Sequence, residues 1–590
     1  MRLYWCLPLR HSFRNCLWTL YVLCALCVSG FALDRNAFTF THYDLRAQVI
    51  PATHSFAASG AVTLRNDSAV PQKVASLQIS SSLAWNSIRI AGNRVGYLTQ
   101  IYTSDIDHTG AVSEAIVTLP REVPPGGTVE LQIGYNGEIE RDATRLTRIG
   151  VPPQIATRND WDEISDTFTA VRGVGHVCWY PVAMDSGSLS EGNSLFEMLG
   201  EWKARHAASS MRLTLTVSSS DSITTNGVVV AQRAVAPKTP ESTETHEGQY
   251  EFFPMGRRPP TFVVAPFAEL SRPTINVSYL PNHKPIAQDY IVAAEKDLPF
   301  LTDWFGAPHE KVRIIELADA DAVPFDSGAV LFTPLRSESA NSLELIVAHQ
   351  IVHASIRSSR PWISEGLAHF AQALTREQQD GRKAALAYLD TYRPALVAAE
   401  KQALAAGTGS EPGTTLPGQP LVRATDEIFY RTKAMFVWWM LRDMVGDQAL
   451  RRAVRAYHAD EDREPSYVQR LVEAQSKRQL EWFFDDWVYR DRGLPDFRIT
   501  AAYARTMLPK NVSVTVTVEN LGAAGAEVPV LVPVAGGAAS RRILVRAGSK
   551  AVDRIEAPQP PSEVIVNDGS VPESDVNNNV FKLPKQGNGS

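Results

Sequence analysis

The segment Leu343–Leu374 reads LELIVAHQIVHASIRSSRPWISEGLAHFAQAL, and the rest of the chain is interpreted from it. His349 and His353 stand four residues apart in an apolar stretch with helical spacing. Residues i and i+4 share one helix face, so both imidazoles can reach one metal ion. Glu365 lies twelve residues beyond His353, near the start of a second apolar segment. Two histidines, one carboxylate and an open position for water make a catalytic zinc site, so we expect these three residues to bind Zn²⁺.

The residue after the first histidine limits the chemistry of such a site. In the H-E-x-x-H motif of zinc peptidases this residue is Glu, the general base. Here it is Gln350. An amide cannot take a proton from a metal-bound water. Gln350 therefore marks the position of a missing catalytic base, and peptide hydrolysis is expected to be impaired or absent.

Other ionisable residues could replace the base or support the metal. Glu344 lies five residues before His349. It is therefore roughly 140° around the helix and is expected to point away. His369 is one turn after Glu365 and could reach the metal, although a supporting or core position is favoured. The pair Asp426-Glu427 either lies near the cleft or forms a solvated helix start.

Length and composition exclude several classes of protein. At 590 residues the chain is too long for one core, and domains of about 100–200 residues predict three to five of them. The content of 44% hydrophobic and 21% charged residues is that of a globular protein. A net charge of -6, without a basic stripe, argues against nucleic-acid binding.

The N-terminus is read as a targeting segment. An apolar run at Cys16–Val28 follows three basic residues, Arg2, Arg10 and Arg14. The run is short for a membrane span, and Ala32 suits a signal-peptidase site, which predicts a signal peptide over residues 1–32. The protein would then be exported (periplasmic, secreted or extracellular), with no membrane span after cleavage. The alternative is an uncleaved N-terminal anchor.

Four of the five cysteines, Cys6, Cys16, Cys24 and Cys27, fall in this targeting segment. Cys178 is then the only cysteine of a cleaved chain, which cannot form an intrachain disulfide. It could be a nucleophile or ligand, but a small buried apolar residue is favoured.

Hydrophobic periodicity divides the remaining chain into three domains and a tail. Short strand-like runs separated by Gly, Pro, Asn and Ser fill residues 33–280, which predicts an N-terminal β saddle or sandwich. Helical spacing follows over 281–495. This region is interrupted by the Gly/Pro/Thr loop Gly407–Pro420. Strand patterns return over 496–570 and predict a small β sandwich, and the polar residues 571–590 predict a disordered tail.

Several motifs, taken in order, resemble one enzyme family. VAHQIVHAS resembles a zinc helix, and WISEGLAHF resembles the W-x-N-E-G-x-A-x-x-F segment that carries the third ligand, here Glu365. FYRTKAMFVWWML resembles a Y-x-K-G-A segment, with one residue more between Tyr430 and Lys433. From about residue 38 to 566 the chain resembles the aminopeptidase N (membrane alanyl aminopeptidase) family of gluzincin zinc metallopeptidases.

This resemblance implies a β saddle, a thermolysin-like, mainly helical catalytic domain and a small C-terminal β sandwich. It also implies zinc-dependent peptide hydrolysis on a peptide or protein substrate, with Tyr430 as the transition-state tyrosine. The chain departs from the family at the substrate site as well as at Gln350. The family's G-x-M-E-N segment is matched only by Gly328-Ala329, which are the candidate substrate-binding residues, since Val330-Leu331 replace Met-Glu.

Two hypotheses follow from these departures. In the first, the protein is a metallopeptidase with impaired catalysis or an altered mechanism. In the second, it is a non-catalytic pseudo-peptidase that binds peptides or a partner protein in the zinc cleft.

Overall fold

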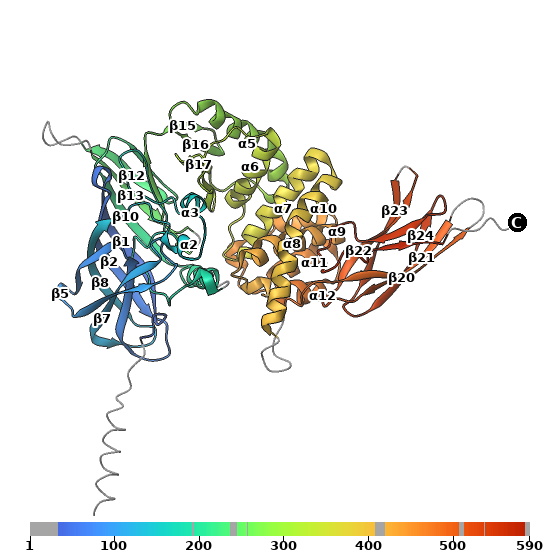
Figure 1. Cartoon of the computed structure of the whole chain (residues 1–590), viewed down its shortest axis with the longest axis horizontal. Helices are drawn as coiled ribbons and strands as arrows, with labels where there is room; N and C mark the ends of the chain where they lie inside the picture. The colour runs from blue at the N-terminus through green and yellow to red at the C-terminus, as the bar shows by residue number, and fades with distance from the viewer. Residues whose placement is uncertain are drawn as a thin grey trace, which may run out of the picture.

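The computed structural model describes residues 33–191, 194–235, 245–256, 258–407, 419–506, 512–535 and 537–584. A β part, a mixed part with most of the helices and a second β part follow one another along the chain, from blue to red in Figure 1. This order matches the predicted β–α–β pattern. The predicted signal peptide and residues 408–418 of the predicted loop lie outside the described ranges. Within those ranges no helix is long and apolar enough to cross a membrane.

The first β part is built on an eight-stranded sheet in the order β12-β13-β10-β1-β2-β8-β4-β5. Neighbouring strands run antiparallel except for β1 and β10, which pair in parallel. Two three-stranded sheets, β3-β7-β6 and β11-β14-β9, accompany it. The strands of these sheets are β1 (Phe38–Ile50), β2 (Ser55–Asn66), β3 (Gln72–Ser80), β4 (Leu83–Ile90), β5 (Asn93–Arg94), β6 (Tyr97–Thr103), β7 (Ala111–Val123), β8 (Thr128–Glu138), β9 (Thr169–Val171), β10 (Ser210–Val217), β11 (Ser222–Thr225), β12 (Val228–Val235), β13 (Thr245–Phe252) and β14 (Phe262–Ala265).

Helices also occur in this part, although the sequence pattern there predicts only strands. They are α2 (Thr144–Arg148), α3 (Pro153–Asn159) and α4 (Ser194–Arg205). The longest, α4, buries only Leu195 and Trp202, so its apolar signal is weak. Cys178 is fully buried, as expected for a small apolar residue, and burial raises the pKa of its thiol well above the usual value.

The second part begins earlier than predicted. Its five-stranded sheet has the order β15-β16-β17-β19-β18, with β18 at one edge and antiparallel to β19. The strands are β15 (Ala268–Ser271), β16 (Ile275–Tyr279), β17 (Val312–Glu316), β18 (Phe325–Ser327) and β19 (Val330–Thr333). The predicted boundary at residue 280 places β15 and β16 in the first part, but β16 pairs with β17. A strand pattern alone does not tell which sheet a strand joins.

The helices of the second part match the segments with three- and four-residue spacing. They are α5 (Lys284–Phe305), α6 (Ala340–Ser355), α7 (Pro361–Asp380), α8 (Arg382–Gly407), α9 (Ala434–Val445), α10 (Asp447–Arg455), α11 (Tyr467–Ser476) and α12 (Glu481–Phe484). One continuous hydrophobic core runs through these helices and on into the last β part. A smaller cluster, including Trp161 and Phe332, joins the first β part to the five-stranded sheet.

The last part consists of two sheets, β20-β21-β24 and β23-β22-β25-β26. Their strands are β20 (Phe497–Thr506), β21 (Val512–Asn520), β22 (Ala526–Val534), β23 (Gly537–Val545), β24 (Lys550–Ala557), β25 (Glu563–Val566) and β26 (Val580–Lys582).

The predicted disordered tail is wrong for residues 571–584. Strand β26 pairs antiparallel with β25, and Glu573 is fully buried. Some of the polar residues on which that prediction rested form buried hydrogen bonds. The Glu573 carboxylate accepts hydrogen bonds from Asn567, Asn579 and the backbone of Phe497.

Asp297 on α5 is a buried carboxyl group that lies near Glu344 of α6. It is 3% exposed, and one of its carboxylate oxygens has no hydrogen-bond partner among the described residues. Burial, followed by the charge of Glu344, raises its pKa to about 7, while Lys296 opposes the shift. The pKa of Asp in an unfolded chain is about 3.9. The folded state therefore favours the protonated form, and stability is lost as the pH rises from about 4 to about 7.

We expect Asp297→Asn to raise stability at pH 8 by on the order of 2–4 kcal/mol, with little change at pH 4, because asparagine stays neutral. Thermal unfolding at the two pH values measures this difference. Asp289→Asn, at an exposed position of the same helix, is the matched control. An equal effect of Asp297→Asn at both pH values would contradict the assignment.

Candidate metal centre

The histidine pair lies on the buried face of α6. The helix begins after Ser339, whose hydroxyl caps it by accepting a hydrogen bond from the backbone N–H of Ser342 at 3.2 Å. His349 and His353 are 9% and 3% exposed. Their Nε2 atoms are 3.1 Å apart and their ring centroids 4.7 Å apart. The predicted i, i+4 arrangement is therefore present, with both Nε2 atoms at one point.

Glu365 reaches the histidines from α7, which starts at Pro361 and so has the preset first turn that proline favours. Its Oε1 lies 3.4 Å from Nε2 of His353, and its Oε2 lies 3.9 Å from Nε2 of His349. The next residue, Gly366, allows a close approach of helices. A Cβ there would come within 2.7 Å of the Cβ of Ala434 at the start of α9. The structure thus brings together the three residues predicted to bind zinc.

A fourth group, Asp326, was missed by the sequence interpretation. It lies on β18, the edge strand of the five-stranded sheet, and its Oδ2 is 3.5 Å from Nε2 of His349. One ligand atom each from Asp326, His349, His353 and Glu365 lie within 4.8 Å of one another. Among the described residues these four form a group able to hold a metal ion. The sequence held one signal for Asp326, because this residue stands two positions before Gly328, a candidate substrate-binding residue.

Gly328 and Ala329 form the two-residue turn between β18 and β19. Ser327 pairs with Val330 across this turn. Gly328 has φ +63°, a conformation that suits glycine at the first turn position. The register also pairs Asp326 with Leu331. Directly paired residues project from the same side of a sheet, so a carboxylate is supplied here from the neighbouring strand. The substrate-binding role of Gly328 and Ala329 stays a prediction.

Arg431 is the second residue that the sequence interpretation missed. Its Nε is 3.1 Å from Oε2 of Glu365, and its Nη2 is 3.5 Å from Oδ1 of Asp326. Its Nη1 is 3.1 Å from the carboxylate of Glu427. Glu427 therefore lies beside the centre, which agrees with the first of its two predicted positions, and its contact is with Arg431. Asp426 is buried and accepts a hydrogen bond from the backbone N–H of Ile428.

A π-helical turn places Arg431 and explains the extra residue in the segment. Residues Ile428–Lys433 form π-helix η4, which continues directly into α9. A π turn takes up one inserted residue without breaking the helix, and such turns are frequent at functional sites. Arg431 thereby faces the centre, while Lys433 faces away and is fully buried. Lys433 forms ion pairs with Asp491 and, at 2.6 Å, with Glu400.

Tyr430 is 8% exposed and lies beside the guanidinium of Arg431, which is 5.8 Å from the centre of its ring. Burial raises the pKa of its hydroxyl well above the usual value, as do the charges of Glu427, Glu365 and Asp326, while Arg431 opposes them. The hydroxyl is thus protonated and able to donate a hydrogen bond at neutral pH.

Gln350 is 2% exposed, and its Oε1 has no hydrogen-bond partner among the described residues. Glu344 points away, as expected from its helix position, and pairs with Lys296 and Gln379. His369 packs its ring against His349 at 5.0 Å between centroids. Burial and then the charge of His349 lower its pKa to about 3, so His369 is a neutral packing partner of that histidine.

The charges of the centre favour ionised carboxylates. Burial alone would raise the pKa of Glu365, but Arg431 and then His353 and His349 outweigh it and hold the pKa well below the usual value. Burial also raises the pKa of Asp326, and Arg431 and His349 outweigh it in the same way. Both groups can therefore act as anionic ligands at neutral pH. Two imidazole nitrogens with two carboxylate oxygens are a donor set that suits Zn²⁺.

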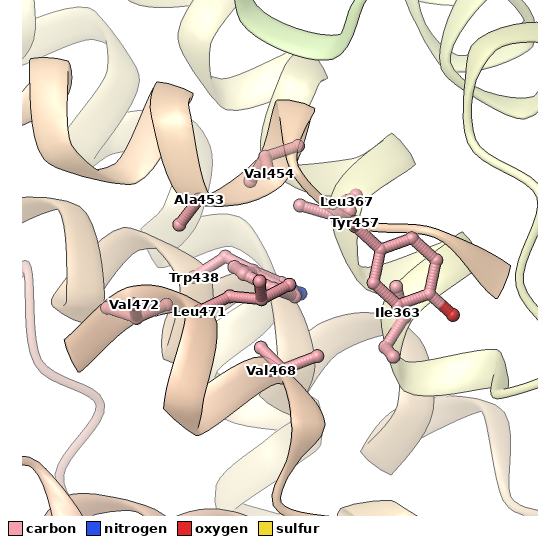
Figure 2. Close-up of a pocket in the computed structure, with 9 residues that line it drawn as sticks. All are labelled: Ile363, Leu367, Trp438, Ala453, Val454, Tyr457, Val468, Leu471 and Val472. Atoms are coloured by element: carbon pink, nitrogen blue, oxygen red, sulfur yellow. The ribbon is translucent and has the colours of Figure 1, made fainter. Parts of the chain in front are cut away.

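An apolar space lies behind the ligand helix. Figure 2 shows residues from α7, α9, α10 and α11 facing one another around it. Its lining consists of Ile363, Leu367, Trp438, Ala453, Val454, Tyr457, Val468, Leu471 and Val472. The cavity volume is about 10 Å³, roughly that of one water probe. None of the ligand groups lines it, so it is a small gap in the packing between these helices and not part of the metal centre.

Comparisons with known proteins found similar solved structures. The M1 zinc metallopeptidase from Deinococcus radiodurans matches with 18% identity and a TM-score of 0.48, covering 79% of this chain and 97% of that one. A mutant form of that enzyme matches with the same identity and coverage and a TM-score of 0.49, and a mutant with bound Tyr-Ser-Ala substrate matches with a TM-score of 0.48. No protein-family model and no curated protein matches the chain.

We expect Arg431→Met to destabilise the metal-free protein, because it removes the cation that Glu365 and Asp326 share. The side chains of Arg431, Asp326 and Glu365 are 18–27% exposed to solvent, which weakens their ion pairs. The free energy of unfolding should therefore fall by on the order of 1–3 kcal/mol. Zinc should recover more of the melting temperature in this variant than in the wild type, because the metal replaces the lost positive charge.

Thermal unfolding with EDTA and with excess zinc measures both effects. Arg431→Lys keeps the charge and serves as the control, with a smaller loss expected. If zinc stabilises all three proteins equally, Arg431 does not neutralise the centre.

Proposed function

We propose that this chain is an exported zinc-binding protein of metallopeptidase type in which peptide hydrolysis is strongly reduced. One observation supports this function above the others. His349, His353, Glu365 and Asp326 converge within 4.8 Å, while the neighbouring position that requires a base holds Gln350. The same polypeptide therefore has the donors for a metal but not the group that would take a proton.

His349, His353 and Glu365 would hold the zinc, with Asp326 beside them. Zinc bound in an open peptidase site lowers the pKa of a water ligand to about 7 and polarises a carbonyl group. A general acid–base group contributes about 10²–10⁴-fold to a rate, and an amide cannot perform its two proton transfers. Tyr430 would still be available as a hydrogen-bond donor to an oxyanion.

The proposed ligand is a peptide. A free α-amine requires an anionic partner, and the family's carboxylate for this contact is replaced by Leu331. Asp326 lies opposite it in the hairpin, but its two oxygens already face His349 and Arg431. We therefore propose weak or absent selection for the free amino end of a peptide.

A second function, a pseudo-peptidase that binds a peptide or partner protein without cleaving it, is favoured by the same contacts. Asp326 lies 3.5 Å from Nε2 of His349, and Arg431 contacts both Asp326 and Glu365, so both side chains lie directly beside the residues that would hold the metal. The two functions differ in one property, which is whether the zinc-loaded protein turns over any peptide.

We expect the purified protein to bind about one equivalent of zinc and to cleave peptides at least about 10²-fold more slowly than an intact zinc aminopeptidase. Gln350→Glu restores the missing base and tests whether the remaining geometry is competent. If Gln350→Glu cleaves peptides and the wild type does not, the protein is a peptidase that has lost only its base.

Metal analysis and a fluorogenic peptide assay measure these properties. Gln378→Glu, which makes the same change at an exposed position of α7, is the matched control and should leave activity unchanged. Less than about a tenth of an equivalent of zinc under zinc-replete conditions would exclude the metal centre. Rapid peptide cleavage by the wild-type protein would contradict the proposal that its hydrolytic activity is strongly reduced.

A further inference from the structure

Three pairs of ligand atoms in the centre lie close to the distances expected around a single tetrahedral ion, and all four atoms lie within 4.8 Å of one another. The Nε2 atoms of the histidines are 3.1 Å apart, and Oε1 of Glu365 is 3.4 Å from Nε2 of His353. Oδ2 of Asp326 is 3.5 Å from Nε2 of His349. Ligands bound to zinc at about 2.0–2.2 Å in a tetrahedron are separated from one another by roughly 3.3–3.6 Å. Asp326 thus stands as close to the histidines as a direct ligand does.

We propose that Asp326 is the fourth protein ligand and closes the metal site. This inference rests on the proposed zinc centre and adds to it that no position is left open for water. Catalytic zinc sites have three protein ligands and an open fourth position, whereas structural sites have four protein ligands. The centre is then structural, and it joins the edge strand β18 to helices α6 and α7.

The contacts of Arg431 support Asp326 as a ligand with a fixed orientation. Each carboxylate divides its oxygens between two partners. Asp326 turns Oδ2 to His349 and Oδ1 to Arg431, while Glu365 turns Oε1 to His353 and Oε2 to Arg431. A guanidinium bound to the outer oxygens leaves one oxygen of each carboxylate for a metal. Hydrogen-bond partners of this kind fix the orientation of a metal ligand.

The charges around the centre suit a divalent ion. Asp326, Glu365 and Glu427 contribute three negative charges, and each forms an ion pair with Arg431, the one cation that they share. Two negative charges therefore remain without a balancing cation in this group, and one divalent ion would neutralise them.

The first β part supports the hairpin that carries Asp326. Phe325, the preceding residue, packs its ring edge-on against His176 at 5.3 Å between centroids. The guanidinium of Arg172 lies 5.5 Å from the centre of the same ring. These contacts hold the strand that carries Asp326 against the first β part.

Cobalt substitution tests whether the fourth position is closed. We would load the full chain with Co²⁺, which reports its coordination through its visible spectrum, and titrate with azide, which binds metals that have an open position. The wild-type spectrum should not change with azide. Asp326→Ala should open the position, so its spectrum should shift with azide, and its Kd for zinc should rise by about tenfold or more.

Two further variants control for folding and for charge. Asp326→Asn keeps the shape of the side chain and should also weaken zinc binding. It serves as the test variant if Asp326→Ala does not fold. Asp321→Asn removes an exposed carboxylate five residues earlier and should bind zinc and cobalt as the wild type does.

The outcomes separate the two proposals. An azide-induced shift in the wild type, or an unchanged zinc Kd in both Asp326 variants, would overturn the closed site and leave the zinc centre standing. A wild-type chain that binds neither Co²⁺ nor Zn²⁺ would overturn the zinc centre itself.

Discussion

The centre depends on the neutralisation of two carboxylates that are placed close together. Asp326 and Glu365 both point at the histidine pair, and like charges at such a distance repel strongly in a partly buried site. Arg431 contacts both of them and makes the arrangement tolerable without a metal. The three elements that meet here, β18, α6 and α7, therefore require the π turn of η4, which carries the arginine.

Regular structure could be predicted from the sequence because its periodicity is local. The helical region after residue 281 and the strand runs on either side of it are confirmed by the structure, and so is the convergence of His349, His353 and Glu365. Their i, i+4 spacing and the position of Glu365 at the start of a helix fix most of that geometry. The positions of β15 and β16 and the folding of residues 571–584 were not predicted, because they depend on which distant strands pair.

Asp326 and Arg431 were not predicted for a related reason. Asp326 lies on a three-residue strand, which is too short for a pattern, and it reaches the centre only because a two-residue turn folds β18 onto β19. Arg431 follows Tyr430 directly, and in an α-helix it would point about 100° away from it. The extra residue before Lys433 was visible in the sequence, but its accommodation as a π turn shows only in three dimensions.

The short turn at Gly328-Ala329 has a consequence for how such a centre could be gained or lost. Side chains alternate between the two faces of a strand, so a shift of one residue in β18 would exchange the face of every side chain. Asp326 would then point away from the histidines, and Phe325 or Ser327 would take its place. A single inserted or deleted codon in this hairpin, with no change in any metal-binding residue, would be enough to convert a four-ligand site into a three-ligand one.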